Sequence, residues 1–368
     1  MIIVQLVPEL QEGGVERGTV ELSREFVLKG HKSFVISRGG TLVQEIEKHG
    51  GHHITLDLCS KNIATVPFRA VRLRSVLRKI QPDIIHARSR VPAWLAYFAN
   101  RKLLLPFVTT VHGIYSVNPY SKIMTKGDAV ICISEVLRDY ARSNYGTDLE
   151  KITVIQRGVD LEYFNPDRLD HDFMANFKTK FNLWNNYIVT SVGRITYLKD
   201  YETFIEAVSI AKEHIPTIKG VIVGGASGDK KDYLGSLKRL AENLEIAENI
   251  LFVGSQAKMP EIYALSDLTV NASLTMGNVG RTVVESLAMD RPVIATSYEG
   301  LVNLVQDGLN GFIIETKNPH DLADKIRRAK QTVFRDIRKR LNPEYTLQTM
   351  VKKTLAVYRQ LLKEPDFK

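Results

Sequence analysis

Residues 187–200 read YIVTSVGRITYLKD and contain the unit from which most of the chain is built. An uninterrupted apolar run ends at Gly193, and a turn that carries Arg194 and Lys199 leads into an amphipathic helix from Asp200. A continuously apolar strand followed by a helix is typical of a parallel sheet that is covered on both faces. The stretch therefore predicts an α/β fold.

The same alternation of short apolar runs and amphipathic stretches continues in both directions. Strands are expected at 2–7, 33–37, 54–56, 84–86, 107–111, 129–133, 152–155, 187–192, 218–223, 250–253, 268–271, 292–295 and 312–314. The pattern lapses between 156 and 186, which divides the chain into two doubly wound, Rossmann-like lobes. We expect an N-terminal domain at 1–160, a C-terminal domain at 161–342 and an amphipathic last helix at 343–368. In such folds ligands bind at the carboxyl ends of the strands.

The composition is that of a globular protein, and its charge is concentrated in one segment. The chain has 368 residues, 44% hydrophobic and 25% charged, which excludes a disordered, collagen-like or disulfide-framework chain. The net charge is +9, and twelve Lys or Arg lie between residues 61 and 126 with one acid, Asp83. Such a segment indicates an acidic partner, which leaves nucleic acid, an anionic membrane or a phosphorylated substrate open.

Cysteine content and hydrophobicity indicate the compartment. Cys59 and Cys132 are the only cysteines and are far apart in sequence, so a reducing compartment is expected. The first ten residues lack a basic region and a cleavage site and predict a strand, and no window holds about 18 apolar, uncharged residues. We therefore expect a cytoplasmic protein, at most peripheral on the inner face of the cytoplasmic membrane.

Glycine-rich turns at the ends of predicted strands are the first candidates for a binding site. Gly13 and Gly14 open a helix, where backbone amides suit a phosphate. Arg194 and Lys199 flank a turn between a strand and a helix, where both can reach a diphosphate. Plain turns and solvated cations remain open as readings of these positions. Two further strand ends carry Gly224 and Gly254.

The segment 277–285, GNVGRTVVE, is the most informative one, because a glycine-rich turn opens a helix that carries Glu285 one turn in. If Val284 and Leu287 face the core, this carboxylate can accept hydrogen bonds from a sugar diol; a solvated helix residue is the alternative. His112 ends a strand and is followed by Gly113. The motif Asp170-His171-Asp172 lies in the joint and not beside a nucleotide-binding strand, so we expect no metal ion and no cofactor beyond the donor substrate.

Taken together, these segments resemble glycosyltransferase family 4, the retaining, nucleotide-sugar-dependent enzymes of the GT-B fold. The resemblance covers nearly the whole chain in the right order, and it rests on residues 13–17, His112-Gly113, 155–160 with Phe164 and Pro166, Gly193-Arg194, Lys199-Asp200, Gly280-Arg281, Glu285, 291–295 and 307–311.

The resemblance implies that the last helix, 343–368, packs back on the N-terminal domain, and it implies roles for the residues named above. Arg194 and Lys199 would hold the donor diphosphate and assist its departure, Glu285 would hold the ribose hydroxyls, and His112 would stabilise the reacting centre. The catalytic set is thus His112, Arg194 and Lys199. The implied donor-binding set is Gly13, Gly14, Gly193, Arg194, Lys199, Gly224, Gly254, Asn278, Val279, Gly280 and Glu285.

An additional, more distant likeness is to members that assemble the lipopolysaccharide core. It rests on residues 86–94 and implies that Arg88, Ser89 and Arg90 bind an anionic saccharide or glycolipid acceptor. Two positions depart from the family. Gly277 replaces a Glu that contacts the donor sugar, and Arg157 replaces the Asn of an Asn-Gly-Val motif.

The leading hypothesis is a metal-independent hexosyltransferase of lipopolysaccharide or cell-envelope glycan synthesis. A non-catalytic GT-B protein that binds a nucleotide sugar, motivated by Gly277, is the alternative, and a nucleotide-sugar 2-epimerase is a further one. Nucleic-acid binding is not expected, because no recognised module is present. The basic stretch 67–79 is a candidate contact with anionic headgroups or phosphorylated sugars; its cations are Arg69, Arg72, Arg74, Arg78 and Lys79.

Overall fold

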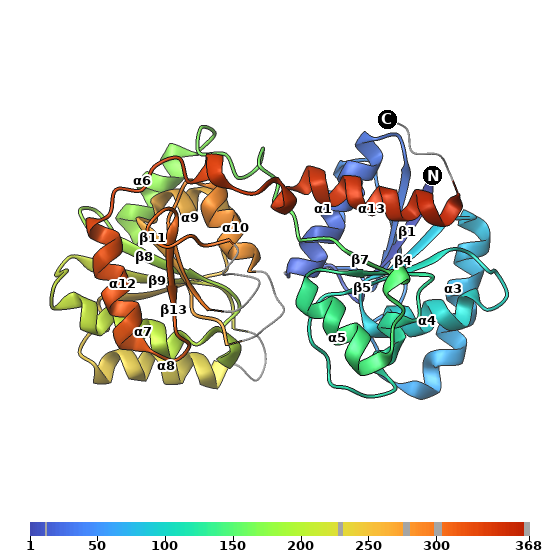
Figure 1. The fold of residues 1–368 in the computed structure, drawn as a ribbon, viewed down its shortest axis with the longest axis horizontal. Coiled ribbons are helices and arrows are strands. Elements are labelled where there is room, and N and C mark those ends of the chain that lie inside the picture. Colours follow the sequence, from blue (N-terminus) through green and yellow to red (C-terminus); the bar gives the residue numbers. More distant parts are fainter. Residues whose placement is uncertain (12, 227–230, 275–279, 298–303, 364–368) are drawn as a thin grey trace. The chain divides into compact units, whose positions relative to one another are not determined.

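The structure is a computed structural model, and it describes residues 1–11, 13–226, 231–274, 280–297 and 304–363. The chain divides into two compact units (Figure 1). Unit 1 comprises Met1–Gly158 together with the segment from Leu347 onward, and unit 2 comprises Val159–Thr346. Each unit contains one parallel sheet with helices on both faces, which confirms the expected α/β class.

The sheet of unit 1 has seven parallel strands in the order β3-β2-β1-β4-β5-β6-β7. Their bounds are β1 (Ile2–Leu6), β2 (Lys32–Ser37), β3 (His52–Thr55), β4 (Ile84–Ala87), β5 (Phe107–Val111), β6 (Ala129–Cys132) and β7 (Ile152–Val154). The strand order reverses between β1 and β4, so the turns that follow these two strands diverge and leave room for a ligand.

Helices on the two faces of this sheet bury its apolar side chains. They are α1 (Gly14–Leu28), α2 (Val43–Lys48), α3 (Val66–Ile80), α4 (Arg90–Asn100), α5 (Glu135–Tyr145) and α13 (Leu347–Leu362), with short 3₁₀ turns at Ile63–Thr65, Ser121–Thr125 and Leu149–Lys151. The last helix, α13, lies beside α1 (Figure 1). The rings of Phe26 and Tyr358 are 5.8 Å apart there, and Val351 and Leu355 are buried in the same cluster. The C-terminal segment is therefore part of the core of unit 1.

The sheet of unit 2 has six parallel strands in the order β10-β9-β8-β11-β12-β13. The order reverses between β8 and β11, and the carboxyl ends of these two strands are the corresponding ligand position. Their bounds are β8 (Tyr187–Val192), β9 (Ile218–Val223), β10 (Ile250–Gly254), β11 (Leu268–Asn271), β12 (Val293–Thr296) and β13 (Gly311–Ile314).

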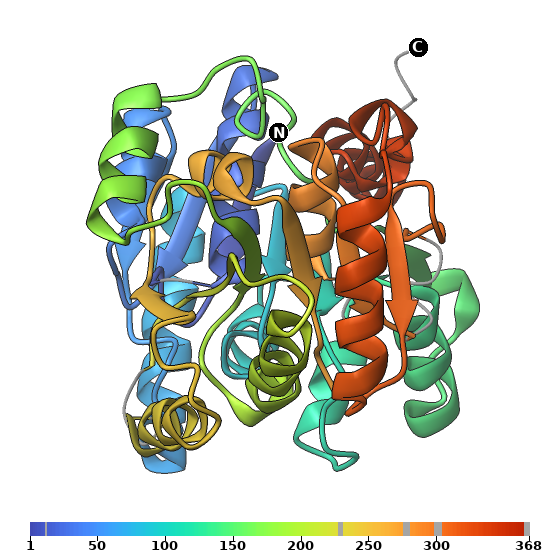
Figure 2. The same ribbon diagram turned by 90° about the vertical axis from the view of Figure 1, so that its left-hand side faces the viewer.

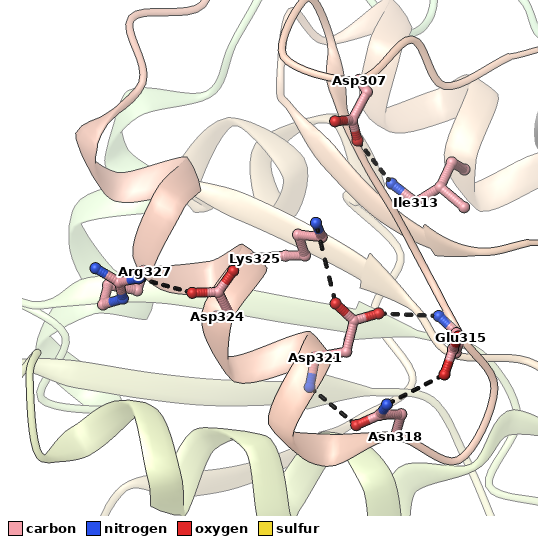
Figure 3. Close-up of polar contacts among 8 residues, drawn as sticks. All are labelled: Asp307, Ile313, Glu315, Asn318, Asp321, Asp324, Lys325 and Arg327. Carbon is pink, nitrogen blue, oxygen red and sulfur yellow. Dashed lines mark hydrogen bonds and ion pairs between the residues drawn. The ribbon is translucent and has the colours of Figure 1, made fainter.

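The helices of unit 2 are α6 (His171–Lys180), α7 (Tyr201–Lys212), α8 (Lys231–Asn243), α9 (Met259–Leu265), α10 (Arg281–Ala288) and α12 (Pro319–Gln331), with 3₁₀ turns at Tyr197–Lys199, Arg338–Arg340 and Pro343–Tyr345. Helix α12 lies alongside β13 (Figure 2) and packs on α7. Its start is fixed by a cap (Figure 3). The Asn318 side chain accepts from the Asp321 amide at 3.0 Å, and the Asp321 carboxylate accepts from the Glu315 amide at 3.0 Å.

The structure differs from the sequence prediction at several elements. Strand β3 runs from His52 to Thr55 and not over 54–56, because the His52 ring stacks on Phe34 of β2, with ring centroids 4.9 Å apart. Helix α6 lies in the joint, where no element was predicted, and Asp170 caps it by accepting from the Phe173 amide at 2.9 Å. Helices α2, α9 and α12 were also not predicted. No helix in the described part of the chain is long and apolar enough to cross a membrane.

Candidate functional site

Three glycines line the carboxyl edge of the unit 2 sheet, at the ends of β8, β9 and β10. The Gly193 amide donates to the Val223 carbonyl at 2.9 Å, and the Gly224 amide donates to the Gly254 carbonyl at 3.0 Å. A Cβ on Gly224, whose φ is +154°, would lie 1.9 Å from the Gly193 carbonyl oxygen. Only glycine allows this close approach, so the edge presents bare backbone on which a flat group can lie.

Lys199 lies over this edge, in the turn between β8 and α7. Its Cε passes 2.8 Å from where a Cβ on Gly193 would be, and its Nζ donates to the Ser273 hydroxyl at 3.1 Å. Burial, and to a smaller extent the positive charge of Arg194, lower the pKa of Lys199 to about 8. Arg194 itself is exposed. Two cations at one strand end, one of them desolvated, favour binding of an anion that restores the charge balance.

A chain of hydrogen bonds fixes the position of the Lys199 ammonium group. The Ser273 hydroxyl donates to Asn271 Oδ1 at 2.6 Å, and Asn271 Nδ2 donates to the Thr282 hydroxyl at 3.0 Å. Asn271 ends β11 and Thr282 lies in the first turn of α10, so the chain joins both sides of the point where the strand order reverses. We did not predict these three residues. Ser273 meets Lys199 across 74 positions of the chain, so no local pattern of the sequence indicates this contact.

Glu285 lies in α10 with Val284 and Leu287 buried beneath it, as the spacing required. Its carboxylate accepts from Arg281 Nε at 2.8 Å and from the Tyr263 hydroxyl at 2.8 Å. Burial raises the pKa of Tyr263 well above its ordinary value, and the nearby carboxylate raises it further, so the phenol stays a donor. Each carboxylate oxygen still has a second lone pair for another donor.

The Gly13-Gly14 turn of unit 1 follows β1 and opens α1. A Cβ on Gly13 would lie 2.1 Å from a carboxylate oxygen of Glu16, and a Cβ on Gly14 would lie 2.9 Å from Nη1 of Arg157. The two glycines thus let a carboxylate and a guanidinium approach the start of the helix. A carboxylate and a guanidinium therefore lie together at the start of α1, which a plain turn does not require.

His112, at the end of β5, lies in the same cluster. Arg157 Nη2 is 3.2 Å from His112 Nδ1, and the His112 backbone amide donates to the Tyr115 hydroxyl at 3.3 Å. Burial lowers the pKa of His112 well below its ordinary value, and the charges of Arg157 and Arg88 lower it further. The imidazole is therefore neutral at physiological pH.

A small cavity of about 20 Å³ adjoins this cluster, lined by residues that include His86, Arg88, His112 and Arg157. His86 bridges two hydroxyls, with Nδ1 2.7 Å from that of Tyr358 and Nε2 2.6 Å from that of Thr110. Tyr358 belongs to α13, so the last helix supplies a wall of the cluster. We did not predict His86, Thr110 or Tyr358 as parts of the site.

The three residues expected to bind the acceptor lie in different surroundings. Arg88 is buried, donates to Gln5 Oε1 at 3.2 Å and lines the cavity. Arg90 lies over the rings of Tyr115 and Tyr120, at 4.8 and 5.4 Å from the ring centres. Ser89 precedes α4 as its N-cap residue and is half-buried. The structure thus brings Arg88 to His112 and places Arg90 in a separate aromatic cluster.

The basic stretch 67–79 is only partly a surface patch, which corrects the expectation. Arg69 is buried and donates to the hydroxyl of Thr65 at 2.9 Å and to the carbonyls of Asp57 at 3.3 Å and Asn62 at 3.2 Å. Arg74 donates to two carbonyls at the end of α4, at 3.0 Å each. Both side chains hold loops and helix ends in place. The exposed cations of α3 are Arg72, Arg78 and Lys79.

The remaining predicted positions add no side-chain contact to the described site. Asn278 and Val279, together with Gly277, lie outside the described residues. Gly280 is the N-cap residue of α10, and Gly254 has open space where a Cβ would be. Asp170 of the rejected Asp-His-Asp motif caps α6 and pairs with Lys258, a structural role.

Comparisons with known proteins agree with this arrangement. Residues 12–163 match the family model described as Glycosyltransferase Family 4, and residues 175–344 match that of Glycosyl transferases group 1. A glycosyltransferase of known structure from Rickettsia africae is 32% identical, with a TM-score of 0.88 and 99% of each chain covered.

Two further similar proteins have more specific names. The alpha-monoglucosyldiacylglycerol synthase of Streptococcus pneumoniae is 27% identical over 351 residues, which are 87% of this chain and 75% of that protein. Alr3699/HepE from Anabaena, solved in complex with UDP-glucose, is 19% identical with a TM-score of 0.83, over 97% of this chain and 99% of that one, a likeness of fold. The resemblance and the GT-B fold are thereby confirmed, and the chain belongs to glycosyltransferase family 4, whose members are retaining enzymes that use nucleotide-sugar donors.

Proposed function

We propose that this protein transfers a hexose from a uridine diphosphate sugar to a glycolipid or saccharide of the cell envelope, lipopolysaccharide core included. The bond between the anomeric carbon and the diphosphate breaks, and a bond to an acceptor hydroxyl forms on the same face. The proton of that hydroxyl leaves with the nucleoside diphosphate. Similarity to a glucolipid synthase and to a protein solved with UDP-glucose supports this choice of donor and acceptor.

The observation that carries the proposal is the pair of cations at the carboxyl end of β8. Lys199 is desolvated and held by Ser273, and Arg194 is exposed beside it, so a diphosphate would gain two ionic contacts there. Glu285 is proposed to accept from the ribose hydroxyls, and the bare backbone of Gly193 and Gly224 to underlie the nucleoside. The amides around Gly280 and the Gly13-Gly14 turn would complete the donor contacts, and His112 would act on the transferred sugar.

The test of this assignment is turnover of a panel of UDP, GDP and ADP sugars by purified protein, with and without envelope glycolipid. We expect Arg194→Ala and Lys199→Ala each to lose about 10²–10³ in kcat/KM, the usual cost of removing one preorganised charge. Both variants should keep the fold, which circular dichroism checks. Near-normal turnover in either variant overturns the donor assignment.

The same panel separates the alternatives. A non-catalytic protein would bind a nucleotide sugar with neither transfer nor hydrolysis, and an epimerase would release the isomerised sugar without any acceptor. Mass spectrometry of envelope glycolipid from a deletion strain tests the acceptor class, because a lost hexose identifies the product. Unchanged glycolipid contradicts the proposed acceptor and leaves the donor assignment to the enzyme assay.

We also propose that α3 contacts an anionic membrane surface, where such an acceptor would be embedded. The exposed face of α3 is apolar at its start and basic towards its end. Phe68 and Val71 of α3 are 70% and 59% exposed, and Ile63 in the 3₁₀ turn before it is 83% exposed, far more than apolar side chains usually are. The cations Arg72 and Lys79 share this face with Arg78. Exposed apolar and basic side chains on one helix face are typical of helices that lie in a membrane interface.

Vesicle sedimentation at low salt tests this contact. Replacing Arg72, Arg78 and Lys79 with Gln removes three charges, each contributing about 1 kcal/mol near an anionic surface. Binding to vesicles of phosphatidylglycerol and phosphatidylcholine should therefore weaken by about 100-fold.

A matched control removes the same net charge from unit 2, at the exposed residues Lys238, Arg335 and Arg340. This control should weaken binding by less than tenfold. Equal losses in both triple variants, or no loss in the α3 variant, would contradict a specific contact through α3.

A further inference from the structure

Arg157 is the one departure from the family pattern that the proposed function leaves without a role. It follows β7 and reaches across the end of the unit 1 sheet, where its Nη2 lies 3.2 Å from His112 Nδ1. Its Nη1 lies 2.9 Å from where a Cβ on Gly14 would be. The guanidinium therefore lies between the glycine turn and the imidazole. The donor and the acceptor of its contact with His112 can be assigned from chemistry alone.

A guanidinium carries only N–H donors and stays protonated, so in this contact His112 Nδ1 must be the acceptor. An imidazole whose Nδ1 accepts a hydrogen bond carries its one proton on Nε2 and is neutral. We propose that Arg157 is a positioning residue that holds His112 as a neutral Nε2–H donor directed at an oxygen of the transferred sugar. The choice of a sugar oxygen rests on the proposed function, whereas the protonation state does not.

The surroundings of Nε2 support a ligand-facing role. Nε2 is buried, and no acceptor for it lies within the described residues. The cavity beside His112 is lined by Arg88 and Arg157, which add positive charge. A buried donor without an acceptor costs about 1–3 kcal/mol, so a substrate oxygen that accepts from it would recover that energy on binding.

The charges around His112 all lower its pKa. From β7 it faces Arg157, from the end of β4 it faces Arg88, and from β4 itself it faces His86, which is neutral because burial lowers its pKa. Tyr115 offers an uncharged hydroxyl. The acids nearest to this group act on Arg88 and not directly on His112; they are Glu16 and Glu21 of α1. Nothing described here favours the imidazolium form.

The Asn that the family pattern has at position 157 is uncharged, so it would not lower the pKa of His112 as Arg157 does. With Arg157 present, His112 can donate a hydrogen bond but cannot take up a proton near neutral pH. It therefore supports the reacting sugar as a fixed dipole, and the rate should not depend on its titration. Replacing Arg157 removes one of the contributions that lower the pKa of His112, while burial and Arg88 remain, so this pKa should rise and His112 should take up a proton at a higher pH than in the wild type.

Nitrogen NMR of the protein labelled with ¹⁵N-histidine tests the proposal without any activity measurement. His112 is assigned by its loss in His112→Gln. In the wild type we expect Nε2 to resonate as a protonated nitrogen and Nδ1 as an unprotonated one, unchanged from pH 8 down to pH 6. A protonated Nδ1 in the wild type refutes the proposal, even if no Arg157 variant folds.

Two variants separate charge from packing. In Arg157→Met, His112 should titrate at a higher pH than in the wild type, whereas Arg157→Lys keeps the charge and should titrate near the wild type. Arg142→Met, at an exposed position of α5, is the matched control and should change neither spectrum nor rate. Identical His112 titration in folded Arg157→Met and in the wild type overturns the proposal.

Kinetics then tests the link to the substrate. In Arg157→Met, kcat/KM should fall about tenfold per pH unit below the new pKa of His112, a limb that the wild type lacks. If the NMR result holds but this limb is absent, the sugar contact is wrong while the positioning by Arg157 stands. If the protein transfers no sugar at all, the proposed function fails and the NMR result is unaffected.

Discussion

The lowered pKa of Lys199 predicts that donor binding by the free enzyme depends on pH, which can be measured. Burial and Arg194 lower this pKa to about 8, so the ammonium is charged at pH 7 and loses its proton as the pH rises through 8. We expect kcat/KM for the nucleotide sugar, measured at subsaturating donor, to fall about tenfold between pH 8 and pH 9.5, because only the charged form binds the diphosphate. The affinity for free UDP, measured by calorimetry, should fall in parallel.

Lys199→Arg should remove the alkaline limb, since a guanidinium stays charged up to pH 12. Lys238→Met, at an exposed position of α8, should leave the limb unchanged. If kcat/KM is flat between pH 8 and pH 9.5, or if Lys199→Arg shows the same fall as the wild type, the reasoning from the structure is refuted.

The same shift predicts a gain in stability when Lys199 is removed. Its pKa is lowered from 10.5 to about 8, which corresponds to about 3 kcal/mol of destabilisation below pH 8 that disappears as the pH rises above 10.5. Lys199→Met removes this cost but loses the hydrogen bond to Ser273, about 1 kcal/mol. The net gain of about 2 kcal/mol should raise the Tm of the nucleotide-free protein at pH 7 by roughly 5 °C. A lower Tm would contradict the assigned burial.

Two further predictions concern positions that the structure distinguishes from similar ones nearby. Gly224→Ala forces a Cβ to within 1.9 Å of the Gly193 carbonyl oxygen and should destabilise the protein by about 1–3 kcal/mol in urea unfolding. Gly235→Ala, in helix α8, should stabilise the protein by about 0.5–1 kcal/mol. Equal effects of the two substitutions would contradict the close approach at Gly224. Arg69→Ala should cost about 1–3 kcal/mol because it removes a buried guanidinium together with its hydrogen bonds to Thr65, Asp57 and Asn62. Arg72→Ala, on the exposed face, should change the unfolding free energy by less than about 0.5 kcal/mol.

Sequence periodicity predicted the strands well because their signal is local. Every predicted strand is present, since an apolar run long enough to cross a covered sheet is visible in one window of sequence. Helix α6 was missed for the opposite reason. Only Phe177 of that helix is fully buried, so its apolar periodicity is weak, and its start depends on a side-chain cap at Asp170.

The candidate site was predicted only in part. Lys199 and Arg194 could be proposed because a strand, a glycine and a helix start are adjacent in sequence. Ser273 could not, because it meets Lys199 across 74 positions of the chain. In the same way Arg69 and Arg72 are alike in sequence, and only packing shows that one is a buried hydrogen-bond donor and the other an exposed charge.

The sequence by itself determined the α/β class and the order of the strands along the chain, because these depend on local apolar patterns and on glycine. It also carried the family motifs, since these are contiguous. The tertiary structure decided which neighbours each polar group acquires. Tyr358 reaches His86 across 272 positions, and Arg157 reaches His112 across 45. Protonation states and anion affinity depend on those neighbours and on burial, and neither can be read from a window of sequence.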